Sequence, residues 1–182
     1  MLYHVSSTSN LKILVPRIST HGKAYVYAIE NVVTAMLFGA KHSDFDFIID
    51  TRNDGRPRLS ECYEGGFERI FKDKTCSIYT VDRNGFKKGI TGWSPEYVSE
   101  NRVRILKEDH VRDLHNRLML EEEQGNLSIR TFEDTSEYKT EIENHIKDRL
   151  IRFNIVNSNC IDPMILSRYG YLIDEIRRSK KG

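Results

Sequence analysis

The sequence has little of what marks several common classes of protein. It contains 3 cysteines, none in a C-x-x-C pair, so neither a disulfide framework nor a cysteine zinc site is indicated. No internal repeat or low-complexity tract is visible. No apolar run approaches the roughly 18–20 residues of a membrane span, and the N-terminus lacks the basic and apolar regions of a secretory signal. We therefore expect a cytoplasmic protein with no membrane partner.

An excess of charge of one sign is also missing. The 28 Lys and Arg residues offset 27 Asp and Glu residues, which leaves a net charge of +1. Non-specific binding to a phosphate backbone is therefore not indicated. The 6 histidines are scattered, and the Walker A, G-x-G-x-x-G, G-x-S-x-G and H-E-x-x-H patterns are absent, so we expect no metal site.

What is present is a first part rich in short strands. Aromatic and β-branched residues with turn signals between them predict strands over 2–6, 24–29, 45–50, 58–63 and 76–82. The apolar segment 11–17 contains Pro16, which argues against a central strand there. Residues 95–106 predict either one last strand or two strands with a kink at Glu100-Asn101.

Helix and turn signals punctuate this first part. Residues 30–40 predict a helix, with Glu30 at the positive end of its dipole. A polar loop is expected over 18–23. Asp54-Gly55 predicts a turn and Asn84-Gly85 a hairpin.

From about residue 108 the pattern becomes helical. Residues 110–124 predict one helix. Apolar residues at helical spacing predict a second, and Asp162-Pro163 predicts the start of a third. The expected buried faces are Tyr138, Ile142, Ile146, Leu150 and Phe153, then Ile165, Tyr169, Leu172, Ile173 and Ile176. We expect an α+β chain with one domain over 1–110 and a helical extension over 111–182 packed on it.

Three separated stretches could carry chemistry together. They are YHVSS at 3–7, YVYA at 25–28 and WSPEYVSE at 93–100. They would supply an imidazole, an aromatic platform and a carboxylate, which suit a ligand with a ribose and a planar cationic ring. Each stretch alone has an ordinary reading: a strand histidine, a core tyrosine pair and solvated acids. The functional interpretation depends on the three occurring in this order.

That order resembles the ADP-ribosyltransferase-like superfamily, in its H-Y-acid branch, which includes small bacterial rifampicin-modifying transferases and tRNA 2′-phosphotransferases. Tyr3-His4 is similar to the start of the family's first strand. Val26-Tyr27-Ala28 and the following helix are similar to its tyrosine strand. Glu96-Tyr97-Val98-Ser99 is similar to its acidic strand. The resemblance covers roughly residues 1–110 and implies a split β-sheet core with helices.

The resemblance implies that NAD is bound as a substrate, and it assigns roles by position. His4 would hold the adenosine ribose, with Ser6 beside it, and Tyr27 would stack on the nicotinamide, with Tyr25 on its other side or in the core. Arg17 would touch the pyrophosphate, or would be an ordinary surface residue. Glu96 would hold the nicotinamide ribose and stabilise an oxocarbenium-like transition state, so Glu96 and Tyr27 would be the catalytic pair. Glu100 is the alternative acid.

Departures from the family pattern keep alternatives open. Val5 stands where relatives favour glycine, and Ile29 stands where they have threonine or serine. We therefore weigh an ADP-ribosyltransferase with an unidentified acceptor (protein, nucleic acid or small molecule) against a non-catalytic interaction module of the same fold. The module would bind a protein partner through its C-terminal helices. An RNA 2′-phosphotransferase would need basic residues around the cleft, for which Arg17, Arg56 and Arg58 are the obvious contributors.

Overall fold

The computed structural model describes residues 1–18 and 22–179, and these divide into two compact units. Unit 1 comprises Met1–His42, Thr51–Pro57 and Phe67–Ser128. Unit 2 comprises Ser43–Asp50, Arg58–Gly66 and Ile129–Gly182. The chain thus has a mixed α+β fold, and its units are not two consecutive stretches: two early segments join the C-terminal part, and residues 111–128 belong with the N-terminal part rather than with an extension beginning at 111.

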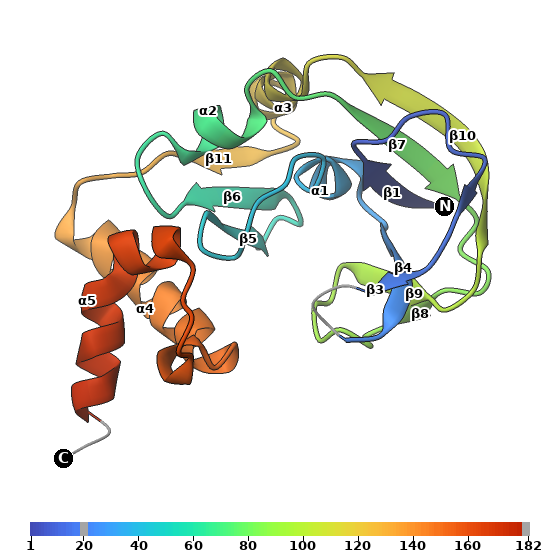
Figure 1. The fold of residues 1–182 in the computed structure, drawn as a ribbon. Helices are drawn as coiled ribbons and strands as arrows, with labels where there is room; N and C mark the ends of the chain where they lie inside the picture. The colour runs from blue at the N-terminus through green and yellow to red at the C-terminus, as the bar shows by residue number, and fades with distance from the viewer. Residues whose placement is uncertain (19–21, 180–182) are drawn as a thin grey trace. The chain divides into compact units, whose positions relative to one another are not determined.

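Unit 1 contains an 8-stranded sheet in the order β2-β10-β7-β1-β4-β9-β8, with β3 paired to β4. Within the described residues, β1 is antiparallel to β4 and β7, β10 to β2 and β7, β4 to β3 and β9, and β8 to β9. In Figure 1, β1, β7 and β10 form the upper half of this sheet and β4, β9 and β8 the lower half. Its strands are β1 (Leu2–Ser6), β2 (Ile13–Leu14), β3 (Arg17–Ile18), β4 (Ala24–Ile29), β7 (Cys76–Val81), β8 (Lys87–Lys88), β9 (Glu96–Ser99) and β10 (Val103–Val111).

The strands predicted over 2–6, 24–29 and 76–82 are thereby confirmed, and the apolar segment 11–17 contributes the short β2 and the start of β3. The loop expected over 18–23 includes residues 19–21, which lie outside the described residues.

One face of this sheet carries an apolar cluster of unit 1. Leu2, Val81 and Tyr97 are almost fully buried there. Because side chains alternate along a strand, these residues mark one face of β1, β7 and β9. The cluster comprises Leu2, Leu14, Val26, Ala28, Tyr79, Val81 and Tyr97.

The helix predicted over 30–40 is the shorter α1 (Val32–Met36). Its N-cap is Asn31, whose side chain accepts a hydrogen bond from the backbone N–H of Thr34 at 2.9 Å. Glu30, predicted to act on the helix dipole, instead accepts hydrogen bonds from Tyr97 Oη at 3.0 Å and Arg83 Nη1 at 3.1 Å. An asparagine at the cap satisfies an amide that no helical carbonyl can reach, which places the start of the helix.

The hairpin predicted at Asn84-Gly85 is wrong, although the turn itself forms. Phe86 N donates to Arg83 O at 3.1 Å, and Gly85 has a φ of 82°. However, the strand after the turn, β8, pairs with β9, because both edges of β7 are already occupied by β1 and β10. Downstream, the two-strand alternative is the correct one: β9 and β10 are separate strands that break at residues 100–102.

The helix predicted over 110–124 begins later than expected. β10 continues to Val111, and α3 runs from Leu114 to Glu123 with Asp113 as its N-cap. Leu114 and Leu118 are fully buried, and Leu114 N donates to Lys74 O at 2.9 Å. These contacts hold α3 in unit 1. Unit 1 also contains most of α2 (Gly66–Phe71), a helix that the sequence did not predict.

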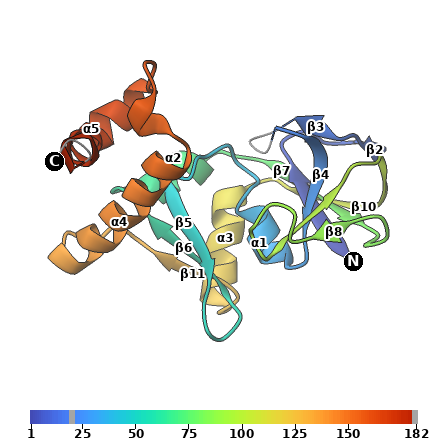
Figure 2. The same cartoon turned by 90° about the horizontal axis from the view of Figure 1, so that it is seen from below.

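Unit 2 contains most of a 3-stranded sheet in the order β11-β6-β5. Its strands are β5 (Phe47–Thr51), β6 (Pro57–Glu61) and β11 (Ser128–Arg130), and its helical elements are α4 (Ser136–Arg152), the 3-10 turn η1 (Ile155–Asn157) and α5 (Pro163–Ser179). Strands β5 and β6 confirm two predictions, whereas β11 was not predicted. Tyr138 on α4 donates its hydroxyl to Glu61 O on β6 at 2.7 Å. Figure 2 shows α4 running beside these strands.

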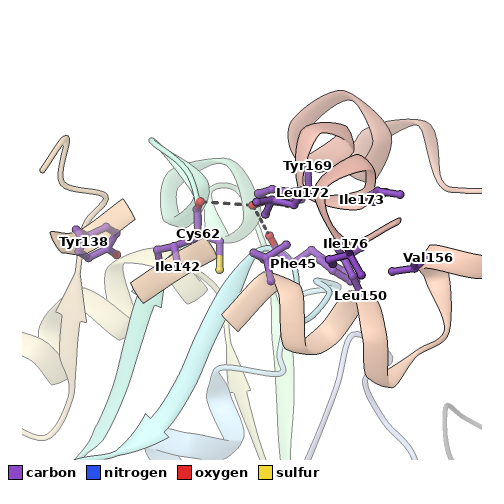
Figure 3. Close-up of a cluster of buried hydrophobic side chains, with 11 residues drawn as sticks. Phe45, Cys62, Tyr138, Ile142, Leu150, Val156, Tyr169, Leu172, Ile173 and Ile176 are labelled. Carbon is purple, nitrogen blue, oxygen red and sulfur yellow. Dashed lines mark hydrogen bonds between the residues drawn. The ribbon is translucent and has the colours of Figure 1, made fainter. Parts of the chain in front are cut away.

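The predicted buried faces of α4 and α5 are confirmed except at Phe153, which is exposed, and at Ile165, which is only half-buried against the same cluster. Tyr138, Ile142, Ile146 and Leu150 are buried on α4, and Tyr169, Leu172, Ile173 and Ile176 on α5, as Figure 3 shows for most of them. Phe153 is 46% exposed, because it follows the last helical residue as the C-cap. Asp162 begins α5 as predicted, since its carboxylate accepts from Met164 N at 2.8 Å and its carbonyl from Leu166 N at 3.0 Å.

Cys62 and Cys76 are buried free thiols, as the sequence suggested, and Cys160 is exposed. Within residues 1–18 and 22–179, no helix combines the length and the apolar character needed to cross a bilayer.

Gly39 provides a test of packing in unit 1. A Cβ added there would lie 2.9 Å from both Cys76 Sγ and Leu114 Cδ2. We expect Gly39→Ala to destabilise unit 1 by about 1–3 kcal/mol, since an overpacked core must shift its neighbours. The measurement is urea unfolding followed by fluorescence of Trp93, the single tryptophan of the chain, which lies in unit 1.

The matched control is Gly170→Ala in α5. There the added Cβ meets nothing closer than Leu166 Cδ1 at 3.5 Å, an ordinary contact. Alanine in a helix interior is favoured over glycine by about 0.5–1 kcal/mol, so this change should leave unit 2 as stable or slightly more stable by far-UV circular dichroism. Equal destabilisation by both variants would contradict the packing explanation.

Candidate functional site

The three stretches singled out in the sequence become neighbouring strands. YHVSS lies on and just after β1, YVYA lies in β4, and EYVS is β9, and the sheet order places β4 between β1 and β9. Tyr3 pairs with Ile29, and Ile29 pairs with Glu96 across the next strand. Residues up to 93 positions apart in the chain therefore meet on one sheet.

The register decides which side chains share a face. Directly opposed residues in an antiparallel pair project to the same side, so Tyr3, Ile29 and Glu96 share a face. Tyr27 lies two residues from Ile29 on the same strand and therefore joins them. His4 is opposite Tyr79 and projects from the other face. The structure thus brings Tyr27 and Glu96 together as side chains, but it does not place His4 on their face.

His4 nevertheless contacts the tyrosine strand through the main chain. Its Nδ1 lies 2.8 Å from the carbonyl oxygen of Tyr27, and because a carbonyl only accepts, Nδ1 carries the hydrogen of this bond. Burial lowers the pKa of His4, an effect that the hydrogen bond to Tyr27 opposes in part. The imidazole is therefore held neutral where β1 and β4 meet.

The face of His4 holds a polar cluster that the sequence reading missed. Tyr79 is fully buried, and its hydroxyl donates to Thr8 O at 2.8 Å and contacts Glu108 Oε1 at 3.1 Å. The His4 and Tyr79 rings lie 6.4 Å apart. The Asn10 N–H and nearby hydroxyls lower the pKa of Glu108. Periodicity shows Tyr79 only as a buried strand residue; nothing in the sequence reveals its partner, which lies 29 residues away.

Ser6 and Ser77 extend this cluster. Ser6 is opposite Ser77 in the register of β1 and β7. Ser77 Oγ lies 3.3 Å from His110 Nδ1. A serine beside a histidine can form a nucleophile, but Ser77 is 1% exposed and so cannot reach a substrate in this arrangement. The predicted ligand residue Ser6 therefore lies beside His4, in a polar environment shared by three strands.

The opposite face carries the remaining predicted residues. Arg17 is opposite Tyr25, so Arg17, Tyr25, Tyr27 and Glu96 all project to this side. The rings of Tyr25 and Tyr27 meet edge to face, with centroids 5.9 Å apart. Tyr25 is buried, Tyr27 and Glu96 are half-buried, and Arg17 is exposed. The arrangement forms an aromatic pair with a carboxylate on the neighbouring strand and a cation near the edge.

Glu100, the alternative acid, lies beyond the end of β9. Its carboxylate is 2.9 Å from Lys23 Nζ and 3.9 Å from Lys87 Nζ. The hydrogen bond and charge of Lys23 lower the pKa of Glu100. Glu100 is thus engaged in surface ion pairs, while Glu96 occupies the strand position beside the tyrosine strand.

The loop before β9 is tied to the end of α1 through aromatic rings. Trp93 and Phe38 lie with ring centroids 5.4 Å apart, and Glu96 N donates to Trp93 O at 3.1 Å. Phe38 is 42% exposed. These contacts position the first residue of β9, which is Glu96.

Two of the basic residues expected for an RNA substrate are already paired. Arg56 contacts Asp54 at 2.6 Å and donates from Nη1 to Gly125 O at 3.1 Å. Arg58 contacts both carboxylate oxygens of Asp50, at 3.0 and 2.6 Å. The Arg58–Asp50 pair is bidentate, and both pairs leave less cationic capacity for phosphate than the sequence suggested.

Comparison with protein-family models, with curated proteins and with solved structures finds no match for this chain. Among the described residues, no group of three or more His, Cys, Asp or Glu side chains is placed to hold a metal ion.

The lowered pKa of His4 predicts a pH-dependent stability. The unfolded chain, in which the histidine has its ordinary pKa of 6.5, binds the proton more readily than the folded one. The unfolding free energy of unit 1 should therefore fall as pH drops through about 6.5, and His4→Gln should reduce that slope. Trp93 fluorescence in urea at about pH 7.5 and about pH 5.5 measures it.

His110→Gln is the matched control, because His110 is exposed and lies on the same face of unit 1. The prediction fails if His4→Gln retains the full pH slope, or if His110→Gln removes as much of it.

Proposed function

We propose that unit 1 is an ADP-ribosyltransferase-like domain that binds NAD and transfers ADP-ribose to an acceptor. The observation that carries the proposal is the adjacency of β1, β4 and β9, with His4 hydrogen-bonded to the main chain of Tyr27 and with Glu96 in register beside the same strand. The sequence motifs that resemble the family therefore converge on one part of the sheet.

The chemistry assigned to this part of the sheet follows from the side chains. Departure of nicotinamide leaves positive charge on the ribose, and a carboxylate held in place stabilises that charge in the transition state. Glu96 is the group proposed for this role. Tyr27, with Tyr25 packed against its edge, supplies an aromatic surface for the nicotinamide ring. His4, neutral and already oriented, would accept a hydrogen bond from a ribose hydroxyl at Nε2 while Nδ1 keeps its bond to the Tyr27 carbonyl.

The separation of faces adds a requirement to the proposal. His4 and Glu96 project from opposite sides, and β1 and β4 share one registered pair, Tyr3 with Ile29, within the described residues. A single nucleotide can reach both groups only where β1 and β4 diverge beyond that pair. The proposal thus predicts that NAD lies across this divergence rather than on either face of a continuous sheet.

The non-catalytic alternative expects a continuous apolar stripe on the last helix. Met164, Leu166 and Tyr171 of α5 are each 45–54% exposed. A helix advances about 100° per residue, so Leu166 projects nearly opposite to Met164. Tyr171, seven residues after Met164, returns to nearly the same face, but its hydroxyl bonds Glu143 at 2.8 Å. Two aligned residues do not make a continuous apolar stripe, so α5 gives the non-catalytic alternative little support.

The test compares Glu96 with Glu100, the two acids between which the sequence alone does not decide. We expect Glu96→Gln to reduce NAD hydrolysis or transfer at least about 100-fold while NAD binding is largely retained, because the amide keeps the size of the side chain and removes its charge. Glu100→Gln, the matched control, should leave turnover unchanged. The measurement uses NAD with a labelled adenylate, with protein, RNA and small-molecule acceptors supplied in separate reactions.

Absence of both NAD binding and NAD turnover in the unmodified chain would overturn the proposal. If NAD binds without turnover, the non-catalytic module replaces it. If turnover requires RNA carrying a 2′-phosphate, the reaction is phosphotransfer. Equal loss in the two variants would remove Glu96 from its assigned role.

A further inference from the structure

Unit 2 contains a surface cavity of about 260 Å³. All the residues that line it belong to this unit, and none of them has a role in the proposed NAD chemistry. Its walls are largely aromatic and aliphatic: Tyr63, Phe132, Ile142, Tyr169 and Tyr171. Binding sites for small molecules are typically apolar concavities with a few well-placed polar groups, and this volume lies just below the usual range of about 300–1,000 Å³. The cavity therefore suits a ligand smaller than a nucleotide.

The inner wall is rigidly positioned. The hydroxyl of Tyr169 donates toward the carbonyls of Phe45 at 3.1 Å and Cys62 at 3.4 Å, as Figure 3 shows. Burial raises the pKa of Tyr169 far above its usual range, so this hydroxyl remains a donor at all physiological pH values. The aromatic surface is thus present before any ligand arrives.

Arg168 is held in the cavity by two contacts. Its guanidinium lies 3.5 Å from the centre of the Tyr63 ring, and Nη1 lies 3.4 Å from Asp46 Oδ1. Burial alone would raise the pKa of Asp46, but hydrogen bonds from Ser43 and Tyr63 and the charge of Arg168 outweigh it and lower the pKa. Asp46 therefore stays ionised and fixes one edge of the guanidinium. Among the described residues, no hydrogen bond is made by Nε or Nη2 of Arg168, which leaves two donors for a ligand.

The other charged residues of the lining divide into paired and unpaired groups. Lys139 forms an ion pair with Asp134, and Glu143 accepts from Tyr171 Oη at 2.8 Å. Glu64 is exposed and, within the described part of the chain, makes no hydrogen bond or ion pair. The two charges with capacity to spare are thus of opposite sign: the remaining donors of Arg168 and the carboxylate of Glu64.

We propose that this cavity binds the zwitterion of a small aromatic amino acid. Arg168 takes the carboxylate, since a guanidinium with two free donors matches the geometry of two carboxylate oxygens. Glu64 takes the ammonium group, and the aromatic ring lies against Tyr63, Tyr169 and Phe132. A ligand with one charge would leave one of the two protein charges without a partner. The site is independent of the proposed NAD chemistry, and either can fail without the other.

The first test uses the full chain and three probes in titration calorimetry: L-phenylalanine, 3-phenylpropionate and 2-phenylethylamine. The two analogues keep the ring and lose either the ammonium or the carboxylate. We expect phenylalanine to bind, and each analogue to bind at least about tenfold more weakly, because a charged hydrogen-bond partner is lost. No binding of phenylalanine, or equal binding of an analogue, would overturn the proposal.

Two variants assign the charges. Glu64→Gln should weaken phenylalanine about tenfold and leave 3-phenylpropionate unchanged, whereas Arg168→Lys should weaken both of these and leave 2-phenylethylamine unchanged. Glu137→Gln and Arg152→Lys are the matched controls, since both residues are exposed on α4 and neither lines the cavity. Glu64 is exposed, so its variant tests the site even if Arg168→Lys fails to fold. The same loss with both analogues in either variant would contradict the assignment.

Discussion

The buried hydroxyl of Tyr79 is the interaction on which unit 1 depends. A fully buried tyrosine must satisfy its hydroxyl, and here the partners are Thr8 O, Leu11 N and Glu108 Oε1. These bonds tie the segment after β1 to strands β7 and β10. The same residue contributes its ring to the apolar core and lies opposite His4. Tyr79 thus joins this apolar cluster to the polar groups beside His4.

The second constraint is the pairing of β4 between β1 and β9. It joins the tyrosine strand to both the histidine strand and the acidic strand, which is the arrangement that supports the proposed NAD chemistry. The alternation of side chains then separates His4 from Tyr27 and Glu96. Any shared ligand must accordingly use the divergence of β1 and β4, and this requirement is sharper than the adjacency of motifs that the sequence suggested.

Unit 2 is built differently, because two helices, α4 and α5, pack against a small sheet. The buried stripe of α4 and that of α5 meet in one apolar cluster. From it, Tyr138 bonds the carbonyl of Glu61, the last residue of β6, and Tyr169 bonds the carbonyl of Phe45, just before β5. The sheet alone could not bury enough apolar surface to be stable. The C-terminal helices are thus part of the core of this unit, and the cavity beside Arg168 lies among the same elements.

The sequence by itself determined the strands over 2–6, 24–29 and 76–82 and the buried faces of α4 and α5, because local periodicity and caps such as Asp162-Pro163 require no distant partner. It could not determine that Asn84-Gly85 joins two strands that do not pair, or that residues 43–50 and 58–66 belong with the C-terminal helices. Nor could it determine that the side chains of His4 and Glu96 project from opposite faces of the sheet. Those outcomes depend on register and on which sheet edges are already occupied. Only the tertiary structure decides them, since pairing between distant strands is chosen by the packing of the whole unit.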